Sequence, residues 1–205
     1  MARILIGFMI CFLFLNCSKK ENQEKDIPYI ISQNNKEKVQ GKDTIPPPPP
    51  IPGYLYYGTN TFIIDKNSNV YYSQRNEIGH ICGNWERNDT IPYFINLQPK
   101  DLIEIPANNI SDLIKANYKD NFRNITFIAS KLDTLNSKIY FDLVNALKSS
   151  LKEDDLYFIR RTTQEEDTVL KYKETNGYYN SEQIKWDKNR ITFPFIKPKL
   201  EEIKD

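Results

Sequence analysis

The clearest pattern in the chain is a run of apolar residues at helical spacing in its second half. Between Ser137 and Lys152 the apolar residues recur every three or four positions, at Ile139, Tyr140, Leu143, Val144, Leu147 and Leu151. This spacing predicts a helix with one broad apolar face, and either Asn136 or Ser137 can cap its first turn. We expect this face to pack on a sheet.

A second helix is expected to begin at Asn108 or Asn109. Asparagine is a favourable N-cap residue, and the apolar residues that follow, Ile110, Leu113 and Ile114, keep a helical period.

The sequence after residue 162 allows two interpretations. Thr163 and Glu166 have the spacing of a capping box, which predicts a helix over residues 164–175. The competing interpretation is a hairpin whose second strand covers residues 168–173, because the side chains there also alternate between polar and apolar.

Runs of β-branched and aromatic residues, separated by polar turns, predict a sheet. Residues 61–64 and 70–73 form the clearest hairpin, because residues 65–69 between them are rich in Asp and Asn. Further strand-like segments lie at residues 93–97, 102–105, 125–132 and 156–162, and residues 183–186 and 191–195 are expected to be late strands or extended segments. Together these elements predict an α+β fold, a mostly antiparallel sheet with two or three helices packed on a face.

The first 16 residues have the pattern of an export signal. Arg3 precedes an apolar run over residues 4–15, and the chain then becomes polar at Asn16-Cys17-Ser18-Lys19-Lys20. At about 1.5 Å per residue these twelve positions span roughly 18 Å, well short of the roughly 30 Å hydrocarbon core of a bilayer. We therefore expect a signal peptide over residues 1–16 rather than a transmembrane helix.

The segment Phe14-Leu15-Asn16-Cys17 resembles the cleavage site of bacterial lipoprotein precursors. In that family the cysteine is diacylated and becomes the N-terminus of the mature protein. The resemblance implies lipid on Cys17 and attachment to a membrane, with the outer membrane as the expected location because Ser18 is not acidic. The many Asn, Lys, Ile and Tyr residues make the mature part similar to small lipoproteins of Bacteroidetes.

Residues 17–53 have the composition of a disordered, proline-rich tether. Residues 18–43 contain six lysines, five acidic residues and few large apolar side chains, and therefore offer little surface to bury. The prolines from Pro46 to Pro50 favour a polyproline II rod that acts as a spacer, although a proline run can also be a ligand for an aromatic groove. We expect a single domain over residues 54–196 and a frayed tail over residues 197–205.

Charge and cysteine content narrow the function classes. The net charge is +1, with 28 basic and 27 acidic residues, so no strong field would attract nucleic acid. Cys11 would be removed with the signal and Cys17 would carry lipid, which leaves Cys82 alone. The fold is therefore expected to depend on its apolar core rather than on disulfides.

Few residues suggest catalysis or metal binding. His80 and Cys82 are the one close pair of a base and a nucleophile, yet the chain has no second histidine to complete a zinc site. In the loop of residues 65–69, Asp or Asn stands at every second position, as in a calcium-binding loop. Such a loop needs Gly at its sixth position and Glu at its twelfth, and these positions are Val70 and Asn76 here. We therefore expect no catalytic residues, no metal and no cofactor.

Four Asp-Thr pairs are each followed by an aliphatic residue. They resemble the short O-glycosylation sequon of exported Bacteroidetes proteins, which implies candidate sugar sites at Thr44, Thr90, Thr134 and Thr168. Asp-Thr also serves in turns and caps, so a purely structural role is the alternative.

These observations favour a lipid-anchored envelope protein whose domain is a non-enzymatic binding or accessory module, such as an immunity lipoprotein. Its partner is expected to be a macromolecule other than nucleic acid, and the sequence does not say which. The alternative is a hydrolase or transferase that acts on envelope polymers through Cys82 and His80.

Overall fold

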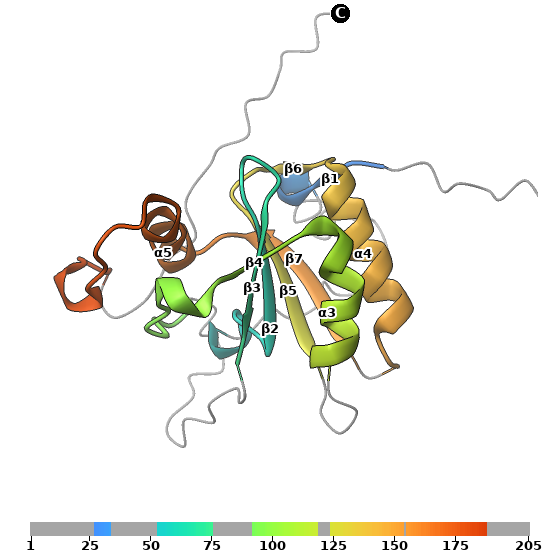
Figure 1. The fold of residues 1–205 in the computed structure, drawn as a ribbon, viewed down its shortest axis with the longest axis horizontal. Coiled ribbons are helices and arrows are strands. Elements are labelled where there is room, and N and C mark those ends of the chain that lie inside the picture. The colour runs from blue at the N-terminus through green and yellow to red at the C-terminus, as the bar shows by residue number, and fades with distance from the viewer. Residues whose placement is uncertain (1–26, 34–52, 76–91, 119–123, 154, 188–205) are drawn as a thin grey trace, which may run out of the picture.

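The computed structural model describes residues 27–33, 53–75, 92–118, 124–153 and 155–187 (Figure 1). Several residues singled out from the sequence lie outside these ranges, namely Cys17, Thr44, His80, Cys82 and Thr90. The expected signal peptide, the proline run and the segment 191–195, expected as a late strand or extended segment, also lie outside them.

A five-stranded sheet forms the centre of the molecule. The hairpin predicted from the sequence is confirmed: β2 (Asn60–Ile64) pairs antiparallel with β3 (Val70–Gln74). The short strand β4 (Ile103–Ile105) extends the sheet on the β3 side. On the other side β5 (Ile125–Ser130) pairs with β2, and β7 (Leu156–Arg161) pairs with β5. The strand order is β4-β3-β2-β5-β7.

The α+β class expected from the sequence is confirmed, and the sheet is mixed. The pairs β2–β5 and β5–β7 are parallel, whereas the other pairs within the described residues are antiparallel. Parallel neighbours need a long crossover between them. Here α4 (Lys138–Ser150) supplies the crossover from β5 to β7.

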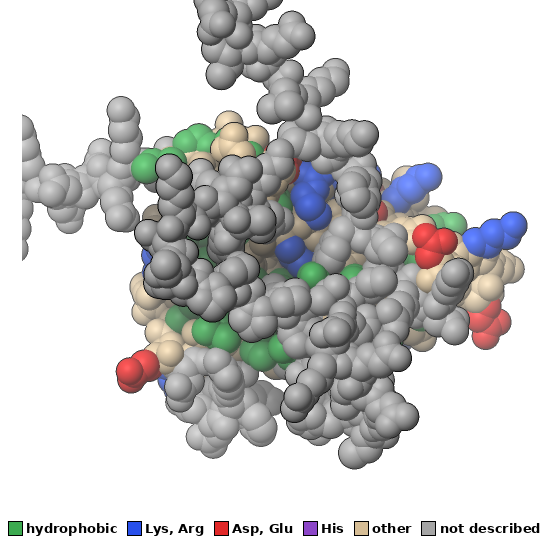
Figure 2. All heavy atoms as spheres, turned by 180° about the vertical axis from the view of Figure 1, so that it is seen from behind, with side chains coloured by type: hydrophobic (Ala, Val, Ile, Leu, Met, Phe, Trp, Pro, Cys, Tyr) green, Lys and Arg blue, Asp and Glu red, His purple; other side chains and the backbone are tan. Residues whose placement is uncertain are grey.

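Helices cover both faces of the sheet (Figure 1). One face carries α3 (Ile110–Asn117) and α4, and the main apolar core lies beneath them. The opposite face carries α5 (Gln164–Thr175), which buries Val169 and Leu170 in a smaller apolar cluster. The face drawn in Figure 2 shows both basic and acidic side chains, as the balanced charge of the chain predicts.

The three predicted helices are all present, and side-chain caps mark the start of two of them. Asn109, expected as a cap of α3, makes no capping hydrogen bond with its side chain. The Ser137 hydroxyl accepts a hydrogen bond from the backbone N–H of Tyr140 at the start of α4. At the start of α5, the side chains of Thr163 and Glu166 bond each other's backbone N–H groups. This capping box settles the sequence after residue 162 as a helix rather than a hairpin.

The N-terminal segment 27–33 is part of the fold, although its composition placed it in the tether. Strand β1 (Tyr29–Ile30) pairs antiparallel with β6 (Thr134–Leu135). Ile31 is only 2% exposed and belongs to the main core. The following residue, Ser32, donates hydrogen bonds from its N–H and hydroxyl groups to the Asp133 carboxylate, at 3.1 and 2.6 Å. The few apolar residues of this segment are thus enough to dock it.

Two segments with a strand-like sequence form no regular strand. Residues 93–97 form no regular strand, because the N–H groups of Ile95 and Leu97 donate to the Glu165 side chain instead of a neighbouring strand. Of residues 183–186, expected as a strand or an extended segment, Gln183 ends a short 3₁₀ helix, η4 (Ser181–Gln183), and Ile184 after it has extended backbone. Other 3₁₀ turns are η1 (Gly53–Leu55), η2 (Pro99–Asp101) and η3 (Ala107–Asn109).

Gly58 lets the chain turn tightly into β2. Its φ of +54° lies in the left-handed region, and a Cβ atom there would lie 2.3 Å from the carbonyl oxygen of Ile125.

Within the described residues, no helix combines the length and the apolar character needed to cross a membrane.

Candidate functional site

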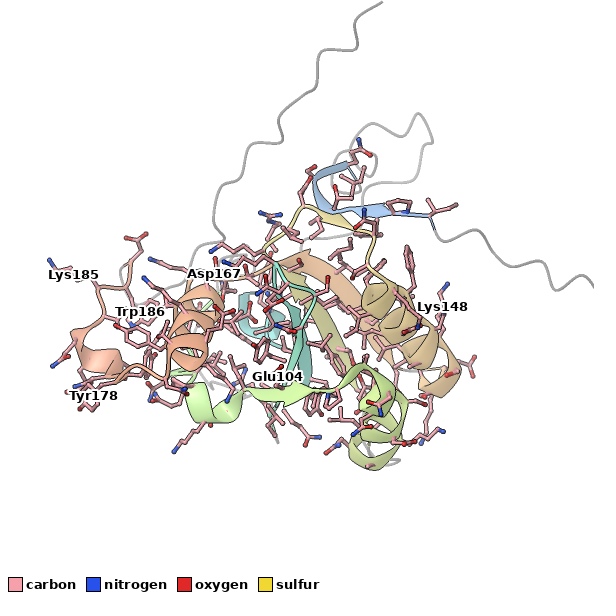
Figure 3. The ribbon with its side chains drawn as sticks, turned by 45° about the horizontal axis from the view of Figure 1, so that its top comes forward. Glu104, Lys148, Asp167, Tyr178, Lys185 and Trp186 are labelled. Carbon is pink, nitrogen blue, oxygen red and sulfur yellow. The ribbon has the colours of Figure 1, made fainter. Side chains whose placement is uncertain are left out.

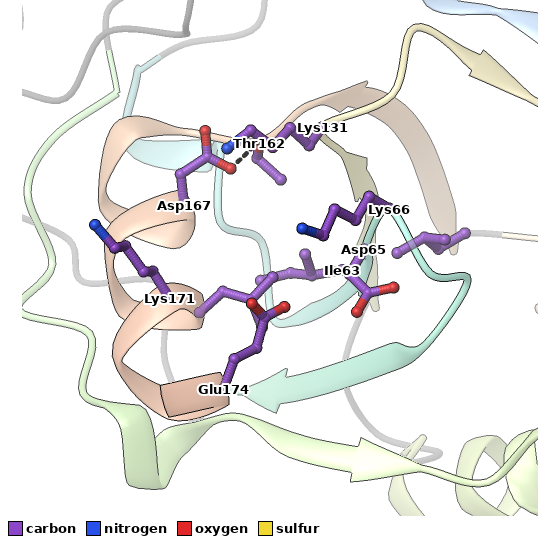
Figure 4. Close-up of a pocket in the computed structure, with 10 residues that line it drawn as sticks. Ile63, Asp65, Lys66, Lys131, Thr162, Asp167, Lys171 and Glu174 are labelled. Carbon is purple, nitrogen blue, oxygen red and sulfur yellow. Dashed lines mark hydrogen bonds between the residues drawn. The ribbon is translucent and has the colours of Figure 1, made fainter. Parts of the chain in front are cut away.

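A pocket of about 320 Å³ opens where the three parallel strands end. Strands β2, β5 and β7 finish at Ile64, Ser130 and Arg161, and the pocket lies between these ends and α5 (Figure 4). From β2 the chain continues to β3 and β4 on one side, and it returns to β5 and β7 on the other. In open sheets with parallel strands, ligands bind at the carboxyl ends of the strands, at the point where the order of the strands in the sheet reverses.

A buried ion pair holds the first turn of α5 at the end of β7. The Arg160 guanidinium donates to both carboxylate oxygens of Glu166, each at 2.7 Å, while Arg160 and Glu166 are 6% and 1% exposed. Arg160 also donates to the carbonyl of Tyr56 at 2.9 Å and stacks over the Phe127 ring at 5.1 Å. This fixed geometry positions the α5 side of the pocket.

A second buried carboxylate, that of Glu165, ties α5 to segments that are distant in sequence. It accepts hydrogen bonds from the Leu97 N–H at 2.7 Å, the Ile95 N–H at 3.2 Å and the Tyr57 hydroxyl at 2.8 Å. Burial raises the pKa of the Glu165 carboxyl above its ordinary value, against these three hydrogen bonds, which lower it. Burial, together with the Glu165 charge, raises the pKa of Tyr57 well above 10.

The carboxylates around the pocket differ in how many hydrogen bonds they already accept from other residues. Asp65 is occupied by its own loop: its oxygens accept from the N–H groups of Asn67 and Asn69 at 2.7 and 2.8 Å, and from the Asn69 amide at 2.9 Å. Asp167 accepts the Thr162 hydroxyl at 2.8 Å. Glu174 has no hydrogen-bond or ion-pair partner among the described residues.

Three lysines, Lys66, Lys131 and Lys171, line the same pocket. Within the described part of the chain none of them has an ion-pair partner within 4.0 Å. Figure 4 shows Lys66 reaching from the β2–β3 loop towards α5, while Glu174 rises from the last turn of α5. The three carboxylates of the lining likewise have no ion-pair partner within 4.0 Å among these described residues, so the charges of the lining balance.

The Asp167→Asn substitution is expected to change how stability depends on pH. Burial raises the pKa of the Asp167 carboxyl in the folded protein, although the Thr162 hydrogen bond and the Lys131 charge oppose the rise. Its contribution to stability is therefore full below the unfolded pKa of about 4 and is lost as the pH rises through the folded pKa. Urea titrations above about pH 4 should show the native protein losing stability relative to the variant. Parallel pH curves for the two proteins would contradict this.

Of the candidate glycosylation sites, two lie in the described residues. The Thr168 hydroxyl, in the first half of α5, donates to the Gln164 carbonyl at 2.8 Å. Thr134 is exposed in β6, and its neighbour Asp133 binds Ser32. Thr134 is thus the more accessible of the two, and sugar on either residue stays a prediction.

Sequence reasoning did not find the pocket, because its charged residues come from separate segments. Lys66 follows β2, Lys131 follows β5, and Asp167 and Glu174 lie on α5. Only Lys66 and Lys131, which come shortly after apolar strands, gave a signal, and that signal has meaning only when the strands are known to be parallel. Among the described residues, no group of three or more His, Cys, Asp or Glu side chains could hold a metal ion.

No protein-family model matches the chain, and neither the curated proteins nor the solved structures contain a match to it.

Proposed function

We propose that this protein is a lipid-anchored component of the cell envelope whose domain acts as a binding module for a small ligand. The observation that carries the binding function is the pocket of about 320 Å³ at the carboxyl ends of β2, β5 and β7. Its lining consists of three apolar residues, Ile63, Ile64 and Leu170, together with Thr162 and charged side chains. A protein partner elsewhere on the surface is compatible with this function.

The rigid setting of the pocket supports binding. The Arg160–Glu166 pair and the three hydrogen bonds to Glu165 fix α5 against the sheet, so the pocket is formed before a ligand arrives. A preformed site loses less conformational entropy on binding. The enzymatic alternative depends on His80 and Cys82, which lie outside the described residues.

The docked segment 27–33 determines how far the domain can lie from its anchor. Only residues 18–26 separate Cys17 from the folded segment, and nine residues reach roughly 30 Å when fully extended. The proline run falls in residues 34–52, between two segments of the fold. The proposal therefore places the domain close to the bilayer, without the proline run as a spacer below it.

The anchor is tested by metabolic labelling with palmitate in a bacterial host that processes lipoproteins. The native protein is expected to take up label and to fractionate with membranes. A Cys17→Ser variant should lose the label, whereas a Cys11→Ser variant should keep it because Cys11 lies within the signal. Equal labelling of both variants, or none in the native protein, would remove the anchoring proposal.

The binding function is tested by recording amide NMR spectra of the mature chain with a panel of small anionic, neutral and cationic molecules. At least one class is expected to shift the signals of Lys66, Thr162 and Leu170, which line the pocket. A panel in which no class shifts these signals would refute the binding module.

A further inference from the structure

We propose that residues 27–33 form a strap with two states: the strap docks on the domain, or it releases while the rest of the domain stays folded. Two residues that compete for one carboxylate, Ser32 and Arg161 for Asp133, set the balance between these states. Release would lengthen the chain between the lipid anchor and the domain. That consequence rests on the anchor of the proposed function, whereas the strap itself does not.

The strap is attached separately from the central sheet. Strand β1 is two residues long and pairs with β6 in a sheet of their own, outside the five-stranded sheet. Two-stranded pairing is at most marginally stable in water, so docking depends on the buried side chain of Ile31 and on the bonds of Ser32. Figure 3 shows β1 at the outside of the domain, beside β6 and the start of α4. Its release therefore leaves the central sheet intact.

Asp133 is hydrogen-bonded to the strap and not to its neighbour Arg161. Ser32 donates its N–H and its hydroxyl to the two Asp133 oxygens, whereas Nη1 of Arg161 lies 3.7 Å from Oδ1, beyond hydrogen-bond distance. Within the described part of the chain, neither Nη1 nor Nη2 of Arg161 has a hydrogen-bond acceptor, although both atoms are buried. Asp167, whose charge also acts on Arg161, accepts the Thr162 hydroxyl instead.

The docked state therefore carries an unfavourable contribution that release removes. A buried donor without an acceptor costs free energy because it has lost its hydrogen bonds to water. When Ser32 leaves, both Asp133 oxygens are free to accept from the guanidinium, in the paired arrangement that arginine and carboxylate favour. The gap between Nη1 and Oδ1 closes with a side-chain movement of about 1 Å. Each state of the strap thus has its own hydrogen bonds to Asp133, which makes the segment a two-state element.

Release changes how far the domain can lie from its anchor. With the strap docked, residues 18–26 connect Cys17 to the fold and reach roughly 30 Å. With the strap released, the connection runs over residues 18–52 and reaches at most roughly 120 Å. The proline run then becomes part of the spacer, as its composition predicts.

The strap is tested by amide hydrogen exchange, followed by NMR on a chain of residues 18–205. The amides of Ile31 and Ser32, which donate to Asp133, report on the strap, and those of Phe127 and Ile128 in β5 report on the central sheet. We expect the protection factors of the strap amides to be at least tenfold lower than those of β5 but clearly above those of an unfolded chain. Protection equal to that of β5, or none, would overturn the strap.

Two variants should change the protection of the Ile31 amide in opposite directions. Ser32→Ala removes a hydrogen bond of the docked state and is expected to lower the protection about tenfold. Arg161→Met removes the group that gains hydrogen bonds on release, so protection is expected to rise about fivefold. If Arg161→Met lowers the protection, Arg161 supports docking as an ordinary ion pair and the competition is refuted.

Lys148→Met is the control for Arg161→Met. It also removes one positive charge, but Lys148 is exposed on α4, away from the strap (Figure 3). The protection of Ile31 should stay unchanged. A rise as large as that of Arg161→Met would show an effect of net charge and would likewise refute the competition.

The change in reach is tested with Ile31→Asp, which places a charge in the core and should hold the strap in the released state. The amides of β5 should stay protected, and their loss would show that the strap cannot leave a folded domain. Neutron reflectometry then compares the lipid-anchored native and variant proteins on a supported bilayer. The mean height of the domain is expected to rise by roughly 15 Å, from the lengths of flexible chains of residues 18–26 and 18–52.

The outcomes separate the strap from the proposed function. An unchanged height, with β5 still protected, would refute the change in reach and leave the strap in place. If palmitate does not label the native protein, the anchor fails and the change in reach fails with it. The exchange results for Ser32→Ala and Arg161→Met decide the strap in either case.

Discussion

The Arg160→Met substitution is expected to lower the free energy of unfolding by about 3–5 kcal/mol. It leaves the Glu166 carboxylate, which is 1% exposed, buried without its guanidinium partner. It also removes the hydrogen bond from Arg160 to the Tyr56 carbonyl. Urea denaturation of the native and variant proteins at neutral pH measures the difference.

The matched control is Lys138→Met, which breaks the pair between Lys138 and Asp142 on α4. The side chains of that pair are 87% and 39% exposed, so the expected loss is below about 1 kcal/mol. A double variant, Arg160→Met with Glu166→Met, should recover part of the loss, because no buried charge is left unpaired. Equal losses for Arg160→Met and Lys138→Met would show that burial of the first pair does not matter.

The Ile31→Ala substitution is expected to lower the free energy of unfolding by about 2–5 kcal/mol. Ile31 is 2% exposed and packs in the main core, where truncation would leave a cavity. Such a loss in the free energy of unfolding would be large for a substitution in a segment that has the composition of a tether. Urea denaturation again provides the measurement.

Ile27→Ala is the natural control for Ile31→Ala. It makes the same chemical change four residues earlier, but Ile27 is 77% exposed, so the expected effect is within about 0.5 kcal/mol. If the two variants have the same stability, residues 27–33 do not contribute to the fold, and the domain begins after the proline run.

The boundary of the domain follows from this pair of substitutions. A domain cut at residue 54 would lack β1 and Ile31, and with them the cover over Leu135 of β6, which is 2% exposed. Binding experiments therefore need a chain that begins at or before Ile27.

The sequence by itself determined the helices after residues 109 and 137, the hairpin and the α+β class, and it left residues 164–175 open between a helix and a hairpin. Capping chemistry and apolar periodicity act within one or two turns of a helix, so Thr163, Glu166 and Ser137 could be assigned their roles from neighbouring residues alone. The Asp and Asn residues between β2 and β3 likewise specify their turn locally.

Only the tertiary structure decided the strand order, the docking of residues 27–33 and the pocket. These depend on contacts between residues far apart in the chain: Ser32 and Asp133 are 101 positions apart, and Tyr57 and Glu165 are 108. Glu165 lies in the first turn of α5, where acidic side chains are ordinarily exposed, yet it is 0% exposed because it accepts hydrogen bonds from the distant N–H groups of Ile95 and Leu97. Local patterns specify elements, whereas the burial of polar groups depends on which distant segment packs against them.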